Sequence, residues 1–239
     1  MMGRGFCASN LGRENAGFMD FYSFVEGPLL WIALMTFFFG TLLRVVLFLV
    51  VSRQTDKIVY EHFSWRYALT TIGRWLLPLN KDVAKNPVFT VLAYVFHICL
   101  LVVPIWYSSH ITLWEESRLE WSWTPIPDAL ADWMTLIFLA IAIFMLLRRI
   151  VSADIRLLST FSDYFLLIVT ALPFLTGYVL THGTLDRIGF LGDNMMLIHM
   201  LAGELMLILI PFTKLSHFVL FFFSRASAGI EFGRRGYSM

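Results

Sequence analysis

Four of the six histidines in this sequence lie within or at the edges of long apolar segments: His97, His110, His199 and His217. Ionisable side chains at membrane depth are costly and usually mark functional sites. His199 and His217 are 18 residues apart, so on one helix both are expected on one face, about five turns and 27 Å apart. His97 and His110 lie 13 residues apart on a segment expected to run the opposite way. Antiparallel packing then pairs His97 with His217 and His110 with His199.

Two imidazoles that face each other from different helices can supply both axial ligands of a six-coordinate haem iron. The two pairs therefore predict two haems, one near each membrane surface, an inner one held by His97 and His217 and an outer one held by His110 and His199. A metal ion alone more often requires a compact cluster of three or four ligands, whereas these residues are spread along the helices. Taken singly, each histidine can also be explained as a hydrogen-bond partner of a neighbouring helix.

The spacing of His97 and His110 conflicts with a straight helix, because thirteen residues advance by about 220° around the axis. Pro104 lies between them and can kink the helix and change its phase. Alternatively, His110 lies just past the end of the helix. His182, in "YVLTHGTLD", is a rival outer ligand in place of His110 or His199.

Further residues are candidates for contact with the cofactors. Gly203 lies one helical turn beyond His199, where a missing side chain lets a flat macrocycle approach the helix; the alternative is small-residue helix packing. Four basic residues near the inner pair are candidates for pairing with haem propionates, or are topology residues that extend to the membrane interface. They are Arg44, Arg148, Arg149 and Lys214.

The segments that carry these residues read as membrane spans. With 58% hydrophobic and 15% charged residues, the chain is too apolar for an ordinary water-soluble surface, and nucleic acid is not an expected partner. A span needs about 20 apolar residues. The candidates are Pro28–Val51, Pro87–Ser108, Ala129–Leu147, Phe161–Leu180 and Met195–Phe223. The sequence therefore predicts an all-α integral membrane protein with a five-helix bundle.

The charges of the connections predict the orientation. Basic residues gather between the first two spans, between the third and fourth, and after the fifth, whereas acidic residues dominate the other connections. The positive-inside rule then places the N-terminus outside and the C-terminus in the cytoplasm. This divides the chain into an outer segment 1–27, a membrane domain 28–223 and a cytoplasmic tail 224–239. The inner loop 52–86 contains a predicted amphipathic helix, Trp65–Leu79, for the membrane surface or a docked subunit.

The fifth span carries the most specific motif. "HMLAGELMLILIPFTKLSH" (His199–His217) has a histidine, a glycine four residues on, Pro-Phe and a closing histidine, and it resembles the gamma subunit of respiratory nitrate reductase, a five-span dihaem cytochrome b. "FH" at Phe96 and His97 and "GTLLR" at Gly40–Arg44 are similar as well. The resemblance implies bis-histidine b haems on the pairs named above.

Other features look more like the related cytochrome b subunits of the transmembrane redox complexes of sulfate reducers. They are the 13-residue ligand spacing, the long connection Ser52–Asn86, and the stretches "LLPLNKDVAKNPVF", "PIWYSSHITLW" and "RRIVSADIRLLSTFSDYFLL". That resemblance implies a bacterial or archaeal cytoplasmic membrane and two partners: a cytoplasmic iron–sulfur subunit related to heterodisulfide reductase, and an extracytoplasmic multihaem cytochrome c. With only Cys7 and Cys99 in the chain, any four-cysteine cluster belongs to a partner.

The leading functional hypothesis is therefore an electron-transfer subunit of a multi-subunit oxidoreductase. It would conduct electrons between a menaquinone pool or an outer cytochrome c and the cytoplasmic iron–sulfur subunit. The alternative is a non-redox transporter or scaffold subunit with a proton pathway, for which Asp163 and Glu204 are the candidate acids. Transporters commonly have internal repeats, and no repeat is evident in this sequence.

Overall fold

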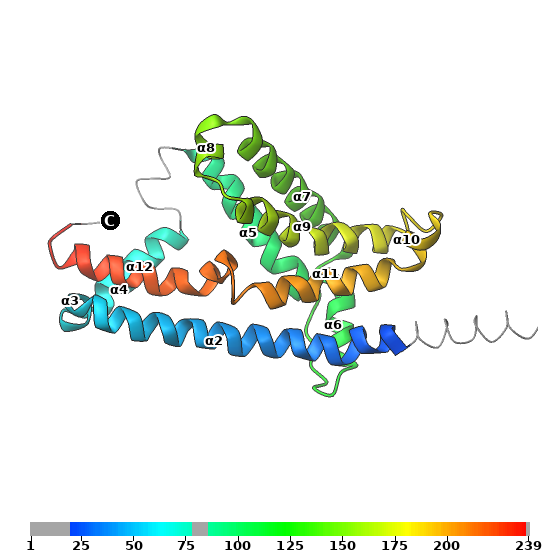
Figure 1. The fold of residues 1–239 in the computed structure, drawn as a ribbon, viewed down its shortest axis with the longest axis horizontal. Helices are drawn as coiled ribbons and strands as arrows, with labels where there is room; N and C mark the ends of the chain where they lie inside the picture. The colour runs from blue at the N-terminus through cyan, green and yellow to red at the C-terminus, as the bar shows by residue number, and fades with distance from the viewer. Residues whose placement is uncertain (1–19, 78–85, 238–239) are drawn as a thin grey trace, which may run out of the picture.

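Helices form all the regular structure of the residues that this computed structural model describes, 20–77 and 86–237 (Figure 1). Four helices are long and apolar enough to cross a membrane, or five if a bent pair counts as one span. The chain is thus built as a multi-pass membrane protein. The elements are η1 (Val25–Leu29), α2 (Leu30–Thr55), α3 (Lys57–Glu61), α4 (Trp65–Leu76), α5 (Pro87–Trp106), α6 (Ser108–Glu115), α7 (Asp128–Val151), α8 (Ala153–Leu158), α9 (Phe161–His182), α10 (Gly189–Asp193), α11 (Met195–Leu209), η3 (Lys214–Ser216) and α12 (His217–Gly233).

The helices extend beyond several of the predicted segments. The first runs from Asp20 to Thr55, so it includes the last part of the segment 1–27, whose residues 1–19 lie outside the described ones. At the other end, α12 continues to Gly233, well into the predicted tail 224–239. The predicted amphipathic helix begins at Trp65 as expected and ends at Leu76.

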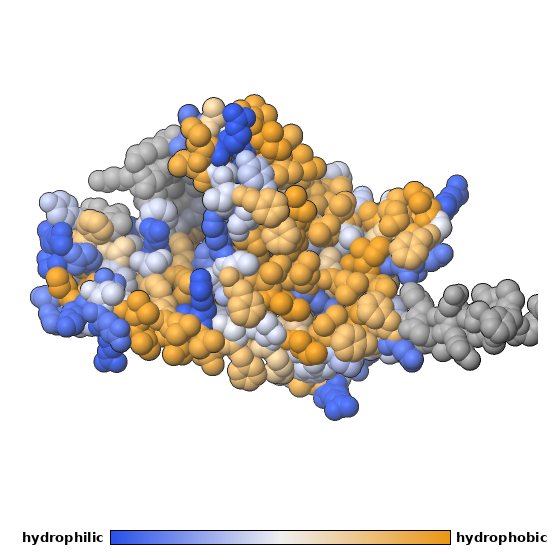
Figure 2. Space-filling view, in the orientation of Figure 1, coloured by the Kyte–Doolittle hydropathy of each residue, from blue (hydrophilic) through white to orange (hydrophobic). Residues whose placement is uncertain are grey.

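The molecule has two ends of opposite character. We call the end that carries α3, α4 and α8 the basic end, and the end that carries α6 and α10 the acidic end (Figure 1). Figure 2 shows a broad hydrophobic surface over α2 and α11, with hydrophilic side chains gathered towards the ends. Large apolar side chains on α2 are accordingly exposed, among them Phe39 at 65%, as expected for a helix that faces lipid.

The second predicted span is interrupted between His97 and His110, the two histidines whose spacing does not fit one face of a straight helix. α5 ends at Trp106, Tyr107 adopts an extended conformation with φ −73° and ψ 135°, and α6 begins at Ser108. Pro104 lies in the last turn of α5, where it has no N–H to donate to the helix. The change of phase therefore comes from an interruption at Tyr107 and not from a kink in a continuous helix.

The fifth predicted span is also broken, which corrects the expectation of one straight helix. α11 ends at Leu209, α12 begins at His217, and the two parts are bent by 72°. Pro211 lies in the break and packs against Gly40 of α2, where an added Cβ would approach the proline ring to 2.8 Å. His199 and His217 therefore do not share one face of one rod.

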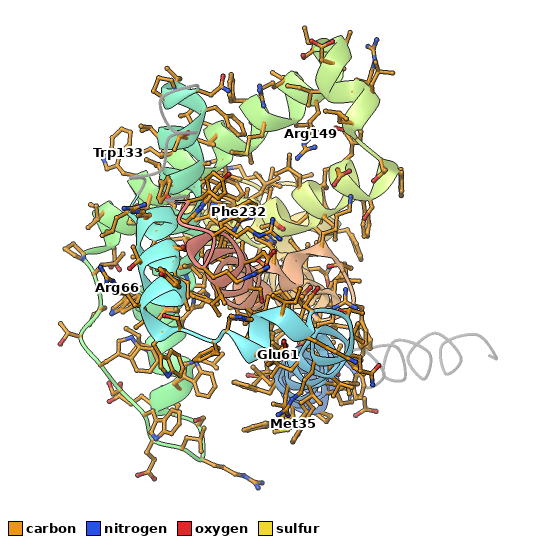
Figure 3. The ribbon with its side chains drawn as sticks, turned by 90° about the vertical axis from the view of Figure 1, so that its left-hand side faces the viewer. Met35, Glu61, Arg66, Trp133, Arg149 and Phe232 are labelled. Carbon is orange, nitrogen blue, oxygen red and sulfur yellow. The ribbon has the colours of Figure 1, made fainter. Side chains whose placement is uncertain are left out.

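Packing arranges these helices in pairs. α11 lies along α9 and α2, α7 lies between α5 and α9, and α12 packs on α4. Phe138 of α7 stacks on Phe96 of α5 and on Phe174 of α9, with ring centroids 4.5 and 3.9 Å apart. Figure 3 looks along α2 from the basic end and shows α4 lying across that end.

Candidate functional site

The structure brings the four candidate histidines together in the two pairs predicted from the sequence. The ring centroids of His97 on α5 and His217 on α12 are 6.0 Å apart, with ring planes at 88°. The ring centroids of His110 on α6 and His199 on α11 are also 6.0 Å apart, with ring planes at 6°. We call them the basic-end pair and the acidic-end pair, respectively.

All four rings use the same nitrogen for hydrogen bonding. Nδ1 of His97 lies 2.7 Å from the carbonyl oxygen of Ala93, and Nδ1 of His217 lies 2.8 Å from that of Lys214. In the acidic-end pair, Nδ1 of His110 lies 3.0 Å from the Pro104 carbonyl oxygen, and Nδ1 of His199 lies 3.1 Å from Oγ1 of Thr176. Within the described residues, none of these hydrogen bonds uses Nε2. A carbonyl partner holds the proton on Nδ1 and leaves the Nε2 lone pair available to a metal.

The two helical segments that carry the pairs stand apart from each other. In the described part of the chain, α5 packs on α7 and does not pack closely on α11 or α12. The rings of both pairs therefore meet where, among the described residues, α5 and α12 on one side and α6 and α11 on the other make few or no close backbone contacts. Such a separation is what a ligand held between the two segments would need.

Two glycines border the acidic-end pair in different ways. A Cβ added at Gly203 would meet no atom within 4 Å. Among the described residues, no neighbouring helix therefore approaches Gly203 closely, which favours the first of its two interpretations. Gly177 of α9 lies against the imidazole of His199, because an added Cβ would come within 3.0 Å of Cε1 of that ring.

A hollow of about 760 Å³ lies beside His217 at the basic end. Its lining includes two of the predicted propionate partners, Arg44 and Lys214, and a third cation, Arg225. Nε of Arg225 is buried without a hydrogen-bond partner among the described residues, and its guanidinium carbon lies 4.2 Å from the ring centroid of Trp75. The cations of α2, η3 and α12 thus converge on the side of the basic-end pair.

The other basic candidates have different surroundings. Nζ of Lys214 donates to Oδ1 of Asp163 at 2.8 Å, which ties the break before α12 to the start of α9. The guanidinium of Arg148 lies over the ring of Phe89, and Arg149 donates to Ser159 at 3.1 Å. Neither arginine lines the hollow, and Figure 3 shows Arg149 well away from the end of α12.

Comparison with known proteins gives one informative match. A protein of Nitratidesulfovibrio vulgaris (strain Hildenborough) is 36% identical over 221 residues, which is 90% of this chain and 95% of that protein. The two proteins belong to one family. No family model matches the chain, and no solved structure matches it. The relative is named only "Protein", so it attaches no activity to the family.

His182, the rival outer ligand, contacts residues outside both histidine pairs. Its Nδ1 bonds the Tyr178 carbonyl oxygen at 3.0 Å, its ring stacks on Tyr178, and its Nε2 lies 3.5 Å from Oδ2 of Asp132. On His182, Nε2 thus lies near a carboxylate, whereas on the four paired histidines the corresponding nitrogen lies near no such group among the described residues. His110 and His199 remain the pair that the fold brings together.

The geometry of the pairs fits a haem iron better than a bare metal ion. A first-row transition metal lies about 2 Å from the nitrogen of a bound imidazole, so a metal between two rings places their centroids about 6 Å apart. Both pairs match that separation. Among the described residues, no three His, Cys, Asp or Glu side chains gather as a metal cluster. Each pair offers two nitrogen ligands, which is the number that a haem iron needs from a protein.

Sequence reasoning missed two residues that the structure places at the pairs. Arg225 falls in the predicted tail. It could have been noticed because only Ser224 separates this charged residue from the apolar run of the fifth span. Thr176 sits beside Gly177 within the apolar segment of α9. A hydroxyl next to a glycine in such a segment was the available signal, but its partner on another helix is visible only in the fold.

Proposed function

We propose that this chain is a membrane electron-transfer subunit that holds two b haems, one on each histidine pair. The observation that carries the proposal is that both pairs, formed by separate helices, have the same 6.0 Å separation and the same engagement of Nδ1. When bound, haem supplies one-electron chemistry. Similarity to the nitrate reductase gamma subunit in the His199–His217 motif supports the same assignment.

The chain's own residues would bind and orient the cofactors. The Nδ1 hydrogen bonds fix each ring and raise its basicity as a ligand. The acidic-end rings are half-buried between apolar helices, which lower the local dielectric. The basic-end rings are exposed, and the hollow lies beside one of them, so a bound haem would itself cover that pair. Arg44, Lys214 and Arg225 would pair with propionates from the hollow, since charge-assisted hydrogen bonds to carboxylates are strong. Gly203 would leave space for the macrocycle of the acidic-end haem.

The two ends would serve different partners. The basic end would face the cytoplasm and dock an iron–sulfur subunit related to heterodisulfide reductase. The acidic end would face outwards and exchange electrons with a multihaem cytochrome c or menaquinone, as in the redox complexes of sulfate reducers that the sequence resembles. On this assignment the chain is one subunit of an oxidoreductase in a bacterial or archaeal cytoplasmic membrane and not a complete enzyme.

Haem content and ligand variants test the proposal. A pyridine haemochrome assay on the fully loaded protein should find about two b haems per chain. His217→Ala should remove the basic-end haem and leave the other, and His199→Ala should do the reverse. His62→Ala is the control, because this histidine lies after α3 and contacts the carbonyl oxygen of Ile58. A loaded preparation with less than one haem per chain contradicts the proposal.

One observation keeps the non-redox alternative in view. Glu204 is 96% buried in α11, since its relative exposure is 4%, and its Oε2 has no hydrogen-bond partner among the described residues. An unpaired buried acid at membrane depth is a feature of proton pathways. Asp163, the second acid, is instead held by Lys214 and by the capping box with Thr160. A haem-free native protein with proton transport that depends on Glu204 would favour this alternative.

A further inference from the structure

The two histidine pairs differ in the relative orientation of their rings. The acidic-end rings are nearly parallel, at 6°, and the basic-end rings are nearly perpendicular, at 88°. The centroid separations are equal, so the difference lies in rotation and not in distance. The residues that hold each ring provide its cause.

His199 is held by a different helix. Oγ1 of Thr176 on α9 lies 3.1 Å from Nδ1 of His199, and the same oxygen lies 2.8 Å from the Leu172 carbonyl oxygen. A threonine hydroxyl has one proton. The proton can go to the carbonyl oxygen of Leu172 or to that of Pro173, which lies 3.2 Å away. In the tautomer with the proton on Nδ1, His199 then donates to Oγ1 and Nε2 is the free lone pair. Thr176 is buried, at 7% exposure, so this arrangement is shielded from water.

Gly177 restricts the same ring by contact. The Cβ that this residue lacks would lie 3.0 Å from Cε1 and 3.4 Å from Nδ1 of His199. The imidazole therefore lies directly on the backbone of α9 at this position. A hydrogen bond on one atom and a backbone surface beside it together restrict rotation of the ring.

The other three rings are bonded to backbone carbonyls nearby in the chain, and for His110 of α6 that carbonyl belongs to the last turn of α5. Nδ1 of His97, His110 and His217 bonds the carbonyl oxygens of Ala93, Pro104 and Lys214, respectively. Among the four rings of the described pairs, His199 is the one whose Nδ1 bonds a side chain of another helix. The orientation of the acidic-end pair thus depends on α9 for His199 and on the end of α5 for His110, whereas that of the basic-end pair depends on α5 and on the turn before α12.

We propose that Thr176 and Gly177 are positioning residues that set the ring plane of His199 parallel to that of His110, so that the two haems have different axial-ligand orientations. The inference rests on the proposed function. In a low-spin ferric haem, parallel imidazole planes would separate the energies of the two iron dπ orbitals, dxz and dyz, whereas perpendicular planes would leave these orbitals nearly equal in energy. Axial ligand geometry and its hydrogen bonds are levers by which a protein tunes a haem.

Electron paramagnetic resonance of the oxidised, fully loaded protein reads this difference directly. The acidic-end haem should give a rhombic spectrum with three resolved features, and the basic-end haem a single broad feature at low field. His199→Ala should remove the rhombic spectrum, and His217→Ala the low-field feature. Two haems with the same type of spectrum would overturn the inference while leaving the proposed function in place, whereas absence of haem would overturn both.

Variants of α9 test the positioning role. Thr176→Val removes the hydrogen bond with little change of shape, and Gly177→Ala pushes on the ring; each should shift the rhombic spectrum towards the low-field type while the low-field feature of the basic end stays unchanged. Thr176→Ser keeps the hydroxyl and should retain the native spectrum. Thr170→Val is the matched control, because this buried threonine of α9 bonds only the carbonyl of Leu166, at 2.7 Å.

The outcomes separate a positioning role from a structural one. A general loss of packing would affect Thr170→Val as much as Thr176→Val and would broaden both haem signals. If Thr176→Val loses the acidic-end haem altogether, Thr176→Ser and Gly177→Ala test the inference instead. A native spectrum for Thr176→Ser and a shifted spectrum for Gly177→Ala would support it. An unchanged rhombic spectrum in both Thr176→Val and Gly177→Ala would overturn it.

Discussion

Replacing Gly203 with leucine tests whether the open space beside the acidic-end pair receives a flat ligand. A Cβ at this position meets no atom within 4 Å, so the chain's own fold has room for it. Leucine is a better helix former than glycine by almost 1 kcal/mol, so folding should be unchanged or slightly strengthened. If a macrocycle occupies the space, the new side chain overlaps it, and overpacking typically costs about 1–3 kcal/mol. Affinity for the acidic-end haem should then fall by roughly 5- to 150-fold.

The assay is transfer of haem from the loaded protein in detergent to an excess of apomyoglobin, followed by absorbance. Gly203→Leu should release one of its two haems faster than the native protein and the other at the native rate. Gly203→Ala should have a smaller effect in the same direction. Gly73→Leu is the control, since a Cβ there also meets nothing within 4 Å and α4 carries neither pair. Release of both haems at the native rate from Gly203→Leu would refute the reasoning about this space.

Other substitutions give shorter tests. His182→Ala should leave the haem-to-protein ratio unchanged, because Nε2 of His182 faces Asp132. Loss of a haem in this variant would show that His182 is a ligand. Gly229→Ala should lower stability by about 1–3 kcal/mol, because the added Cβ would lie 2.6 Å from the backbone oxygen of Tyr67. The same change at Gly73 should be neutral or stabilising, and equal melting temperatures would contradict this. Arg225→Gln should speed haem release from the basic end alone, and equal release from both ends would exclude its role with propionates.

The long helices were predictable because hydropathy reports the need to satisfy every backbone polar group within a membrane. Ala129–Leu147 lies within α7, and Phe161–Leu180 lies within α9. Helix ends have local signals as well. Thr160 and Asp163 form a capping box at the start of α9, and Gly183 ends that helix with φ 57°, a conformation that glycine adopts at little cost.

Hydropathy averaged over a span did not predict the helix interruptions, although polar residues lie at both: Ser108 and Ser109 follow Tyr107, and Thr213 and Lys214 follow Pro211. Pro104 marks the right region of the second span, but the interruption falls three residues later, at Tyr107. Pro211 marks the break after α11, yet a proline within a membrane helix often produces only a kink. Its packing against Gly40 of α2 depends on a contact between distant parts of the chain, which no local pattern reveals.

The two interruptions explain how one bundle can hold two separately oriented pairs. Tyr107 lies between His97 and His110, and the break at Pro211 lies between His199 and His217. Each histidine therefore belongs to its own helical unit, with the basic-end pair on α5 and α12 and the acidic-end pair on α6 and α11. On uninterrupted helices, His97 and His110 would point about 220° apart around their axis, whereas His199 and His217 would point in the same direction. The two facing pairs could not then both form. The interruptions let each histidine face its partner, and the contacts around each ring, such as those of α9 with His199, then determine whether the two planes are parallel or perpendicular.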